Sequence, residues 1–568
     1  MTVYRPDRPL IVQADRSLLL EVDNPHFADC RDRLAAFAEL RKSPEHIHTY
    51  AITSLSLWNA CSAGVTLQFV TETLEEYAKF DLPANVMTDI SDLMSRYGRI
   101  RLFRQAGSLT LEVDDPDLLQ QLERNSRLAP MLGARTGHQA EIAPGDRGKL
   151  KQALLKAGLP VEDLAGYTEG TNFPIQLRSG ELAGGVELRD YQIQAIDAFW
   201  ANGAPSGGSG VLVLPCGAGK TVIGLGVMER ASTHTLILCT GISAVRQWQR
   251  EILDKTQISA EAVGEYSGEH KEIKPITLAT YQVMTTRKKG TRDEFPHLEI
   301  FMREDWGLII YDEVHLLPAP VFRATAEIQS RRRLGLTATL VREDGNEEDV
   351  FSLIGPKKFD APWKDLEQQG WIAPAVCTEV RVPMPRDRRL EYSGAEQRDK
   401  YRIAATNPTK LLAMGALLER HRSDRVLVIG QYLEQLDEVA EFLKAPLITG
   451  KTPNRQREKL YESFRGGAIK QLVVSKVANF AIDLPEANVA IELSGTFGSR
   501  QEEAQRLGRV LRPKVDGGQA YFYGVVSHDT IDQVYSDHRQ LFLTEQGYRY
   551  EIEDFEPTKD LELERKGA

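Results

Sequence analysis

Short runs of apolar residues alternate with longer amphipathic segments from about residue 183 onward. Continuous apolar runs of this kind are typical of parallel strands buried on both faces, and the segments between them are long enough to form crossover helices. The runs form two series: Val211–Leu214, Leu236–Leu238 and Leu308–Ile310, then Val426–Ile429, Leu472–Val474 and Val489–Leu493. The pattern predicts an α/β fold with two doubly wound parallel-sheet domains in tandem.

The chain before these two domains has a mixed pattern. Strand-like runs such as Pro9–Val12 stand beside helix-like segments such as Val86–Tyr97, which predicts small mixed α/β domains at the N-terminus. A glycine-containing stretch at Leu182–Gly185 indicates a hinge where the pattern changes. The predicted domains cover residues 1–104, 105–182, 183–372 and 373–568.

Composition and charge narrow the class of protein. The 5 cysteines include no CxxC pair, which argues against disulfide frameworks, zinc ribbons and iron–sulfur clusters. No apolar run reaches membrane-spanning length and no secretory leader pattern opens the chain, so we expect a cytoplasmic protein without a membrane partner. Because the formal net charge is -11, any binding of nucleic acid has to come from local basic clefts.

A glycine-rich loop follows the first strand of the first parallel-sheet domain. The loop Pro215–Thr221 joins Val211–Leu214 to the helix-like segment Val222–Val227. In such a loop, backbone N–H groups and the helix dipole face phosphates, a lysine neutralises them and a hydroxyl can ligate Mg²⁺. Leu214 breaks the strict GxxxxGK[ST] pattern, and a glycine-rich surface turn is the alternative. The predicted nucleotide-binding residues here are Gly217, Ala218, Gly219, Lys220 and Thr221, with Lys220 also catalytic and Thr221 also a metal ligand.

Two carboxylates follow an apolar strand further along this domain. The run Trp306–Tyr311 ends in Asp312 and Glu313, and the C-terminal ends of parallel strands form the crevice where open α/β sheets bind ligands. We predict that Asp312 holds Mg²⁺ and that Glu313 orients and deprotonates the water that attacks the γ-phosphate. The alternative is a solvated acidic turn. The position directly after an apolar strand favours the functional interpretation over this alternative.

A basic segment in the second parallel-sheet domain supplies candidate arginine fingers. The sequence Gln505–Arg512 places Arg509 and Arg512 three residues apart on one helical face. Such arginines can reach across a cleft and neutralise the charge of the transition state, whereas a solvated basic helix face is the alternative. We predict that Arg509 and Arg512 are catalytic and that Gln505 binds the nucleotide.

Together, these residues resemble the motifs of superfamily two helicases, whose two motor domains are RecA-like. The resemblance implies that Arg189 and Gln192 contact the adenine end of ATP. It also implies that Thr240 with Gln247–Trp248, and Thr280–Gln282, belong to elements that touch the nucleic-acid backbone.

Several motifs resemble in sequence those of the XPB family of DNA repair helicases. The similar stretches are Pro9–Gln13, Pro44–Tyr50, Asp312–His315, Arg342–Asp344 directly after Thr337–Val341, Ser475–Val477 and Ile482–Asn488. The resemblance to superfamily two helicases implies that Leu336–Thr339 couples hydrolysis to movement. The resemblance to the XPB family implies that Arg342, Glu343 and Asp344 help to separate strands. It also implies that residues 105–182 correspond to a damage-recognition domain.

The family further implies a thumb-like insertion at about residues 385–404. The stretch Arg386–Arg402 is rich in arginine and has Tyr392 and Tyr401 interleaved, a composition suited to phosphates and to base stacking. An exposed helical hairpin fits this composition equally well.

A histidine pair and an arginine run are interpreted as structural rather than functional features. His46 and His48 lie two residues apart but have no evident third ligand, so we do not predict a metal site there. The basic run Arg331–Arg333 is predicted to be a solvated helix end before a core strand.

These motifs predict an ATP-dependent DNA helicase or translocase with ATP and Mg²⁺ as cofactors. The resemblance implies three-prime to five-prime polarity and a role in nucleotide excision repair, with single-stranded and forked or damaged duplex DNA as partners. A monomer of a compact bacterial or archaeal type, working with a nuclease, is expected. An RNA helicase is one alternative, because the motor motifs contact the backbone. A nucleotide-gated module that binds damaged DNA without unwinding it is the other.

Overall fold

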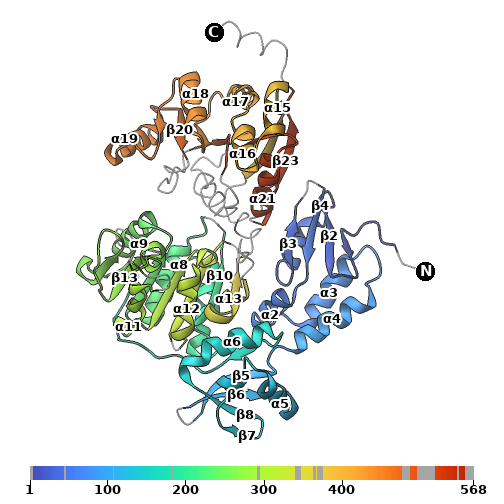
Figure 1. Ribbon diagram of the computed structural model, residues 1–568, viewed down its shortest axis with the longest axis vertical. Coiled ribbons are helices and arrows are strands. Elements are labelled where there is room, and N and C mark those ends of the chain that lie inside the picture. The colour runs from blue at the N-terminus through green and yellow to red at the C-terminus, as the bar shows by residue number, and fades with distance from the viewer. Residues whose placement is uncertain are drawn as a thin grey trace. The chain divides into compact units, whose positions relative to one another are not determined.

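The chain forms two compact units (Figure 1), one of residues 1–39, 49–215 and 219–361 and one of residues 40–48, 216–218 and 362–568. The computed structural model describes residues 4–43, 46–105, 108–178, 180, 185–215, 217–288, 290, 294–329, 331–338, 347–361, 366, 375–475, 487–495, 519–545 and 549–556. Across these ranges, no helix is long and apolar enough to cross a membrane.

A seven-stranded sheet with the order β12-β13-β11-β14-β15-β10-β16 is the centre of the first unit. Its strands are β10 (Ser209–Val213), β11 (Thr235–Cys239), β12 (Val263–Tyr266), β13 (Ile276–Thr280), β14 (Leu308–Asp312), β15 (Arg332–Thr337) and β16 (Lys357–Asp360). The main helices of this domain are α7 (Asp190–Trp200), α8 (Lys220–Ala231), α9 (Ile242–Lys255) and α12 (Ala319–Glu327). Described neighbours in the sheet pair in parallel, as the buried apolar runs predict.

The register of this sheet decides which chain segments meet at its C-terminal edge. Val213 of β10 pairs with Thr337 of β15, and Asp312 of β14 pairs with Leu336 of β15. The loops that follow β10, β14 and β15 therefore leave the sheet side by side, although they are far apart in the sequence.

A second seven-stranded parallel sheet, in the order β19-β20-β18-β21-β22-β17-β23, forms the centre of the second unit. Its strands are β17 (Ala375–Val382), β18 (Val426–Gly430), β19 (Leu447–Ile448), β20 (Gln471–Ser475), β21 (Val489–Glu492), β22 (Ala520–Ser527) and β23 (Arg549–Asp554). Its helices include α15 (Arg386–Gly394), α16 (Gln397–Ala405), α17 (Thr409–Arg420), α18 (Leu433–Leu443), α19 (Asn454–Arg465) and α21 (Ile531–Glu545). The predicted fold class, with two tandem doubly wound parallel sheets, is confirmed.

Two smaller sheets precede the first parallel sheet. The first sheet has the order β1-β2-β4-β3 and the second has the order β7-β8-β6-β5-β9. Their strands are β1 (Leu10–Val12), β2 (Ser17–Glu21), β3 (Glu39–Lys42), β4 (Ile47–Ala51), β5 (Ile100–Gln105), β6 (Ser108–Val113), β7 (Arg135–Thr136), β8 (Gln139–Ile142) and β9 (Val161–Asp163). The helices beside them are α1 (Phe27–Leu34), α2 (Ser54–Ser62), α3 (Leu67–Tyr77), α4 (Ala84–Ser95), α5 (Pro116–Arg124) and α6 (Arg147–Lys156). The expected boundary between residues 104 and 105 falls inside β5.

Helix α6 of the second small sheet packs closely against α12 of the first parallel-sheet domain. A Cβ atom at Gly148 would clash with the backbone of Ala326, so only glycine permits this approach. Next to it, Asp163 accepts from Arg147 Nη2 at 2.6 Å and from Lys151 Nζ at 2.9 Å. Lys151 Nζ also donates to Gln329 Oε1 at 3.0 Å. A buried ion cluster therefore joins residues of the small domain to the first parallel-sheet domain.

The basic run Arg331–Arg333 contradicts the prediction of a solvated helix end. Arg333 lies in β15 and is fully buried, where it donates to the carbonyl oxygens of Leu353 and Gln329 at 2.7 and 2.8 Å. Its guanidinium also stacks over the ring of Tyr167, 5.4 Å from the centroid. Three adjacent arginines look like a surface run in sequence, but the alternation of side chains along a strand sends one of them inward.

The stretch predicted as a thumb or a hairpin forms the two helices α15 and α16. Tyr401 is buried and its hydroxyl donates to the carbonyl of Gly495 at 2.8 Å. The hydroxyl of Tyr392 accepts from the backbone N–H of Ile531 at 2.9 Å. Both tyrosines therefore make contacts within the second unit. The presence of tyrosines among the arginines of this stretch does not by itself indicate stacking on bases.

Candidate functional site

The glycine-rich loop has the backbone that a phosphate-binding turn requires. Gly217 and Gly219 have φ angles of +85° and +76°, a conformation that other residues adopt only with strain, and Gly219 is the N-cap of α8. The twelve-residue helix α8 therefore begins directly after this loop. A Cβ atom at Gly219 would lie 2.7 Å from Gln192 Nε2, so the side chain predicted to read the adenine end lies beside this loop. Cys216 is outside the described residues.

Lys220 and Glu313 contact each other across the C-terminal edge of the sheet. Lys220 Nζ lies 2.7 Å from Glu313 Oε1, and the side chains of Lys220 and Glu313 are only 14% and 11% exposed. Glu313 has a φ of +52°, which is uncommon for a residue with a side chain and often marks a functional position. The register of the sheet thus brings together the two residues that we predicted as phosphate ligand and general base.

Asp312 is held by two aromatic residues. Trp248 Nε1 donates to Asp312 Oδ2 at 3.0 Å, and the hydroxyl of Tyr281 donates to the Asp312 carbonyl at 2.9 Å. Burial raises the pKa of Tyr281 well above its ordinary value, and the nearby Asp312 carboxylate raises it further, so the phenol keeps the proton that it donates. These bonds fix both the backbone and the carboxylate of the predicted Mg²⁺ ligand.

His315 joins the acidic strand end to the neighbouring strand. Its Nδ1 lies 2.6 Å from Thr337 Oγ1 and 3.6 Å from Glu313 Oε2, and both His315 and Thr337 are buried. Thr337 ends β15 and belongs to the stretch that resembles the coupling motif. The side chains of the two motifs are therefore in direct contact.

We expect Thr337→Val to impair strand separation more than ATP hydrolysis. The substitution keeps the shape of the side chain but removes its hydrogen bond with the buried His315 imidazole, a loss on the order of 1–3 kcal/mol that is concentrated at the contact between the motifs. Unwinding of a forked DNA per ATP hydrolysed should fall roughly tenfold, since about 1.4 kcal/mol corresponds to one factor of ten. An equal loss of both activities would contradict a coupling role for this contact.

The residues predicted to touch the nucleic-acid backbone differ in exposure. Thr280 is buried and its hydroxyl accepts from the N–H of Val283, so it caps the short helix α10 (Tyr281–Met284). Thr240 is half-buried, and its carbonyl accepts from the exposed Gln282 side chain. Trp248 is buried as well. Gln247 is half-buried like Thr240, so Thr240, Gln247 and Gln282 are the residues of these elements that reach the surface.

Six predicted site residues lie outside the part of the chain that the structure describes. They are Arg342, Glu343, Asp344, Gln505, Arg509 and Arg512. Their roles remain predictions.

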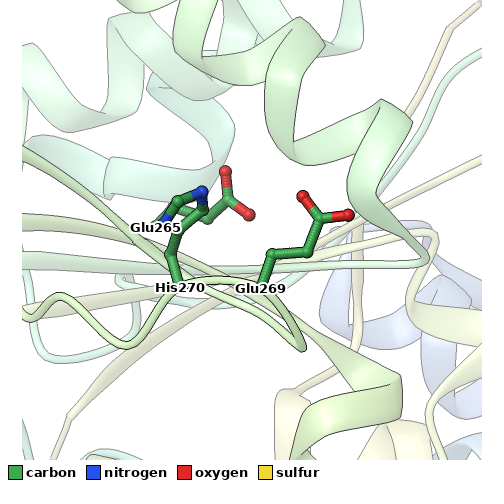
Figure 2. Close-up of side chains that lie close together, drawn as sticks. All are labelled: Glu265, Glu269 and His270. Atoms are coloured by element: carbon green, nitrogen blue, oxygen red, sulfur yellow. The ribbon is translucent and has the colours of Figure 1, made fainter. Parts of the chain in front are cut away.

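A separate group of possible metal ligands lies in β12 and the turn that follows it. Figure 2 shows Glu265, Glu269 and His270, whose ligand atoms lie within 4.8 Å of one another. Arg246 pairs with Glu269 at 3.2 Å, and the Ser267 hydroxyl donates to Glu265. Because Glu269 and His270 are exposed, and exposed acidic groups often lie together without an ion, we assign no metal to this group.

The fold and the site define a class of protein. A glycine-rich loop after β10, two carboxylates at the end of β14 on the same sheet edge and a second parallel-sheet domain in the same chain are the parts expected of a nucleotide-driven helicase motor.

Comparison with known proteins identifies the family. The family model of the ERCC3/RAD25/XPB C-terminal helicase matches residues 366–565, that of the type III restriction enzyme res subunit matches 185–342, and that of the helicase conserved C-terminal domain matches 10–137. The DNA 3'-5' helicase XPB of Mycobacterium tuberculosis is 55% identical over 550 residues, covering 96% of this chain and 98% of that protein. The chain belongs to the XPB family of helicases.

Other relatives carry the same family name. The DNA 3'-5' helicase XPB of Kineococcus radiotolerans is also 55% identical, over 96% of this chain and 97% of its own length. The general transcription and DNA repair factor IIH helicase/translocase subunit XPB/SSL2 of Saccharomyces cerevisiae is 30% identical over 96% of this chain and 73% of its own. The similarity therefore extends through the small N-terminal sheets as well as the two parallel-sheet domains.

Proposed function

We propose that this chain is an ATP-dependent DNA helicase that moves three-prime to five-prime and acts in DNA repair. The observation that carries the proposal is the cluster of Lys220, Asp312 and Glu313 at one sheet edge, in a chain that is 55% identical to named DNA 3'-5' helicases over almost its whole length. The cluster lies at the C-terminal ends of the parallel strands, which is where open α/β sheets generally bind their ligands.

The ion pair between Lys220 and Glu313 suggests how hydrolysis would be gated. ATP and Mg²⁺ would supply the phosphoryl group and the charge that activates it. Lys220 would leave Glu313 Oε1 to neutralise the phosphates, while Thr221 and Asp312 would hold the metal ion. Glu313, released from its partner, would then accept a proton from the attacking water. Arg509 and Arg512 are proposed to complete the site from the second parallel-sheet domain.

The proposed partners are single-stranded and forked or damaged duplex DNA. Thr240 and Gln282 would contact the backbone of the tracked strand, and Arg342, Glu343 and Asp344 would separate it from its complement. Residues 105–182 would recognise damage. The buried cluster around Asp163 would couple damage binding to the first parallel-sheet domain. We further propose a cytoplasmic monomer that works with a nuclease.

A strand-displacement assay with tailed duplexes tests this proposal. We expect the protein to displace the strand from a three-prime-tailed DNA duplex in the presence of ATP and Mg²⁺, and to leave a five-prime-tailed duplex and an RNA duplex intact. Preference for the RNA duplex would favour the RNA helicase. Tight binding of damaged DNA that ATP alters, with no displacement of either tailed duplex, would favour the nucleotide-gated module.

A further inference from the structure

The structure places Trp248 in a position that the sequence does not predict. It lies on α9, is 1% exposed, and donates its indole N–H to Asp312 Oδ2 at 3.0 Å. The family resemblance places this residue in an element that touches nucleic acid. A side chain that is buried against the ATP site cannot make that contact.

The indole ring of Trp248 packs closely against the first parallel-sheet domain's helix α8. A Cβ atom at Gly224 would lie 2.5 Å from Trp248 Cη2 and 3.2 Å from Cζ3, so the ring lies directly against α8, the helix that begins at the phosphate loop. Its polar edge faces the end of β14. One side chain therefore contacts both halves of the nucleotide site.

A hydrogen bond of this kind controls how a carboxylate meets a metal ion. Residues that bond to a metal ligand orient it, and their loss typically costs about ten- to a hundredfold in metal affinity or activity. The indole N–H is a donor only, so it cannot exchange roles with the carboxylate. Tyr281 fixes the backbone of Asp312 separately, and Trp248 donates directly to its carboxylate.

We propose that Trp248 is a positioning residue that orients the carboxylate of Asp312 for Mg²⁺ and so ties α9 to the ATP site. The inference rests on the proposed function, in which Asp312 is the Mg²⁺ ligand. Helix α9 begins two residues after Thr240, so Trp248 also connects the metal site to the element proposed to follow DNA.

The test compares Trp248→Phe with Trp306→Phe. Trp306 is a matched control, because it is also fully buried in this domain and its Nε1 donates to the carbonyl of Ile300 at 2.8 Å, away from Asp312. Two readouts are needed: the Mg²⁺ concentration for half-maximal ATPase activity on DNA, and the affinity for Mn²⁺ with ADP, measured by electron paramagnetic resonance. We expect Trp248→Phe to weaken both about tenfold or more, with the maximal rate recovered at high Mg²⁺. Trp306→Phe should leave both unchanged.

A second pair of variants covers the case in which Trp248→Phe folds poorly. Gly224→Ala pushes the indole ring away from α8. Gly226→Ala on the same helix meets the side chains of Ile196 and Leu188 instead, so it serves as the control for an added methyl group that does not touch Trp248. Weaker Mn²⁺ binding in Gly224→Ala alone would support the proposal. Unchanged Mn²⁺ affinity in Trp248→Phe, or an equal loss in Trp306→Phe, would overturn it. Because Mn²⁺ binding is measured without turnover, it decides the role of Trp248 even if the wild-type protein hydrolyses no ATP, an outcome that would refute only the proposed function.

Discussion

Glu313→Gln should abolish most ATP turnover while nucleotide binding survives. The amide keeps the size of the side chain but cannot accept the proton of the attacking water, and general bases typically contribute about 10²- to 10⁴-fold to a rate. The substitution also removes the charge that pairs with Lys220 Nζ at 2.7 Å. The expected result is a fall in kcat of that size, with an unchanged or tighter Kd for ATP, measured by steady-state kinetics and fluorescent-nucleotide titration.

Lys220→Ala is the matched comparison for this prediction. It removes the other half of the same ion pair, so both variants lose the contact seen between the two side chains. Lys220→Ala should weaken ATP binding itself, because the phosphates lose their neutralising charge. If Glu313→Gln weakened ATP binding to the same extent and kept its turnover, Glu313 would be a structural partner of Lys220 rather than the base.

Asp163→Ala should destabilise the first unit by about 3–5 kcal/mol, because it leaves two buried cations without their carboxylate. Arg147 and Lys151 are 2% and 7% exposed in this cluster, and Asp163 is 10% exposed. Urea unfolding, followed by tryptophan fluorescence, measures the loss. The exposed pair Arg99–Asp114 in the same small domain is the control, since its side chains are 37% and 47% exposed and Asp114→Ala should cost under about 1 kcal/mol.

The same cluster predicts how stability depends on pH. Burial alone would raise the pKa of Asp163, but the charges of Lys151 and Arg147 outweigh it and hold the pKa well below its ordinary value. A carboxyl group with a lowered pKa in the folded protein stabilises it above about pH 4 and loses that contribution as the pH falls further. Wild type should therefore lose stability below pH 4 more steeply than Asp163→Ala. Equal slopes for the two proteins would contradict a charged Asp163 in the folded state.

The tandem parallel sheets and the main parts of the nucleotide site could be predicted because their signals are local. Runs such as Leu308–Ile310 reveal a buried strand, and a glycine-rich loop before Lys220 reveals a phosphate turn, each within about ten residues. The strands also carry Asp312 and Glu313 to the same edge as this loop, as the rule for parallel sheets predicts.

The contacts that link distant segments could not be predicted in the same way. Trp248 and Asp312 are 64 residues apart, and Lys151 and Gln329 are 178 apart, so no spacing in the sequence relates them. Arg333 shows a related difficulty, because a charged residue is normally exposed unless it finds buried partners. Its partners are mainly backbone carbonyls, with the side chains of Ser209 and Tyr167, and the sequence marks none of them.

The measurement that tests the central claim most directly is steady-state ATPase activity with no nucleic acid, single-stranded DNA, forked duplex DNA and RNA, for wild type and Glu313→Gln. A DNA motor predicts strong stimulation by single-stranded and forked DNA, little by RNA, and loss of activity in the variant. Equal or greater stimulation by RNA, or turnover that persists in Glu313→Gln, would contradict this account.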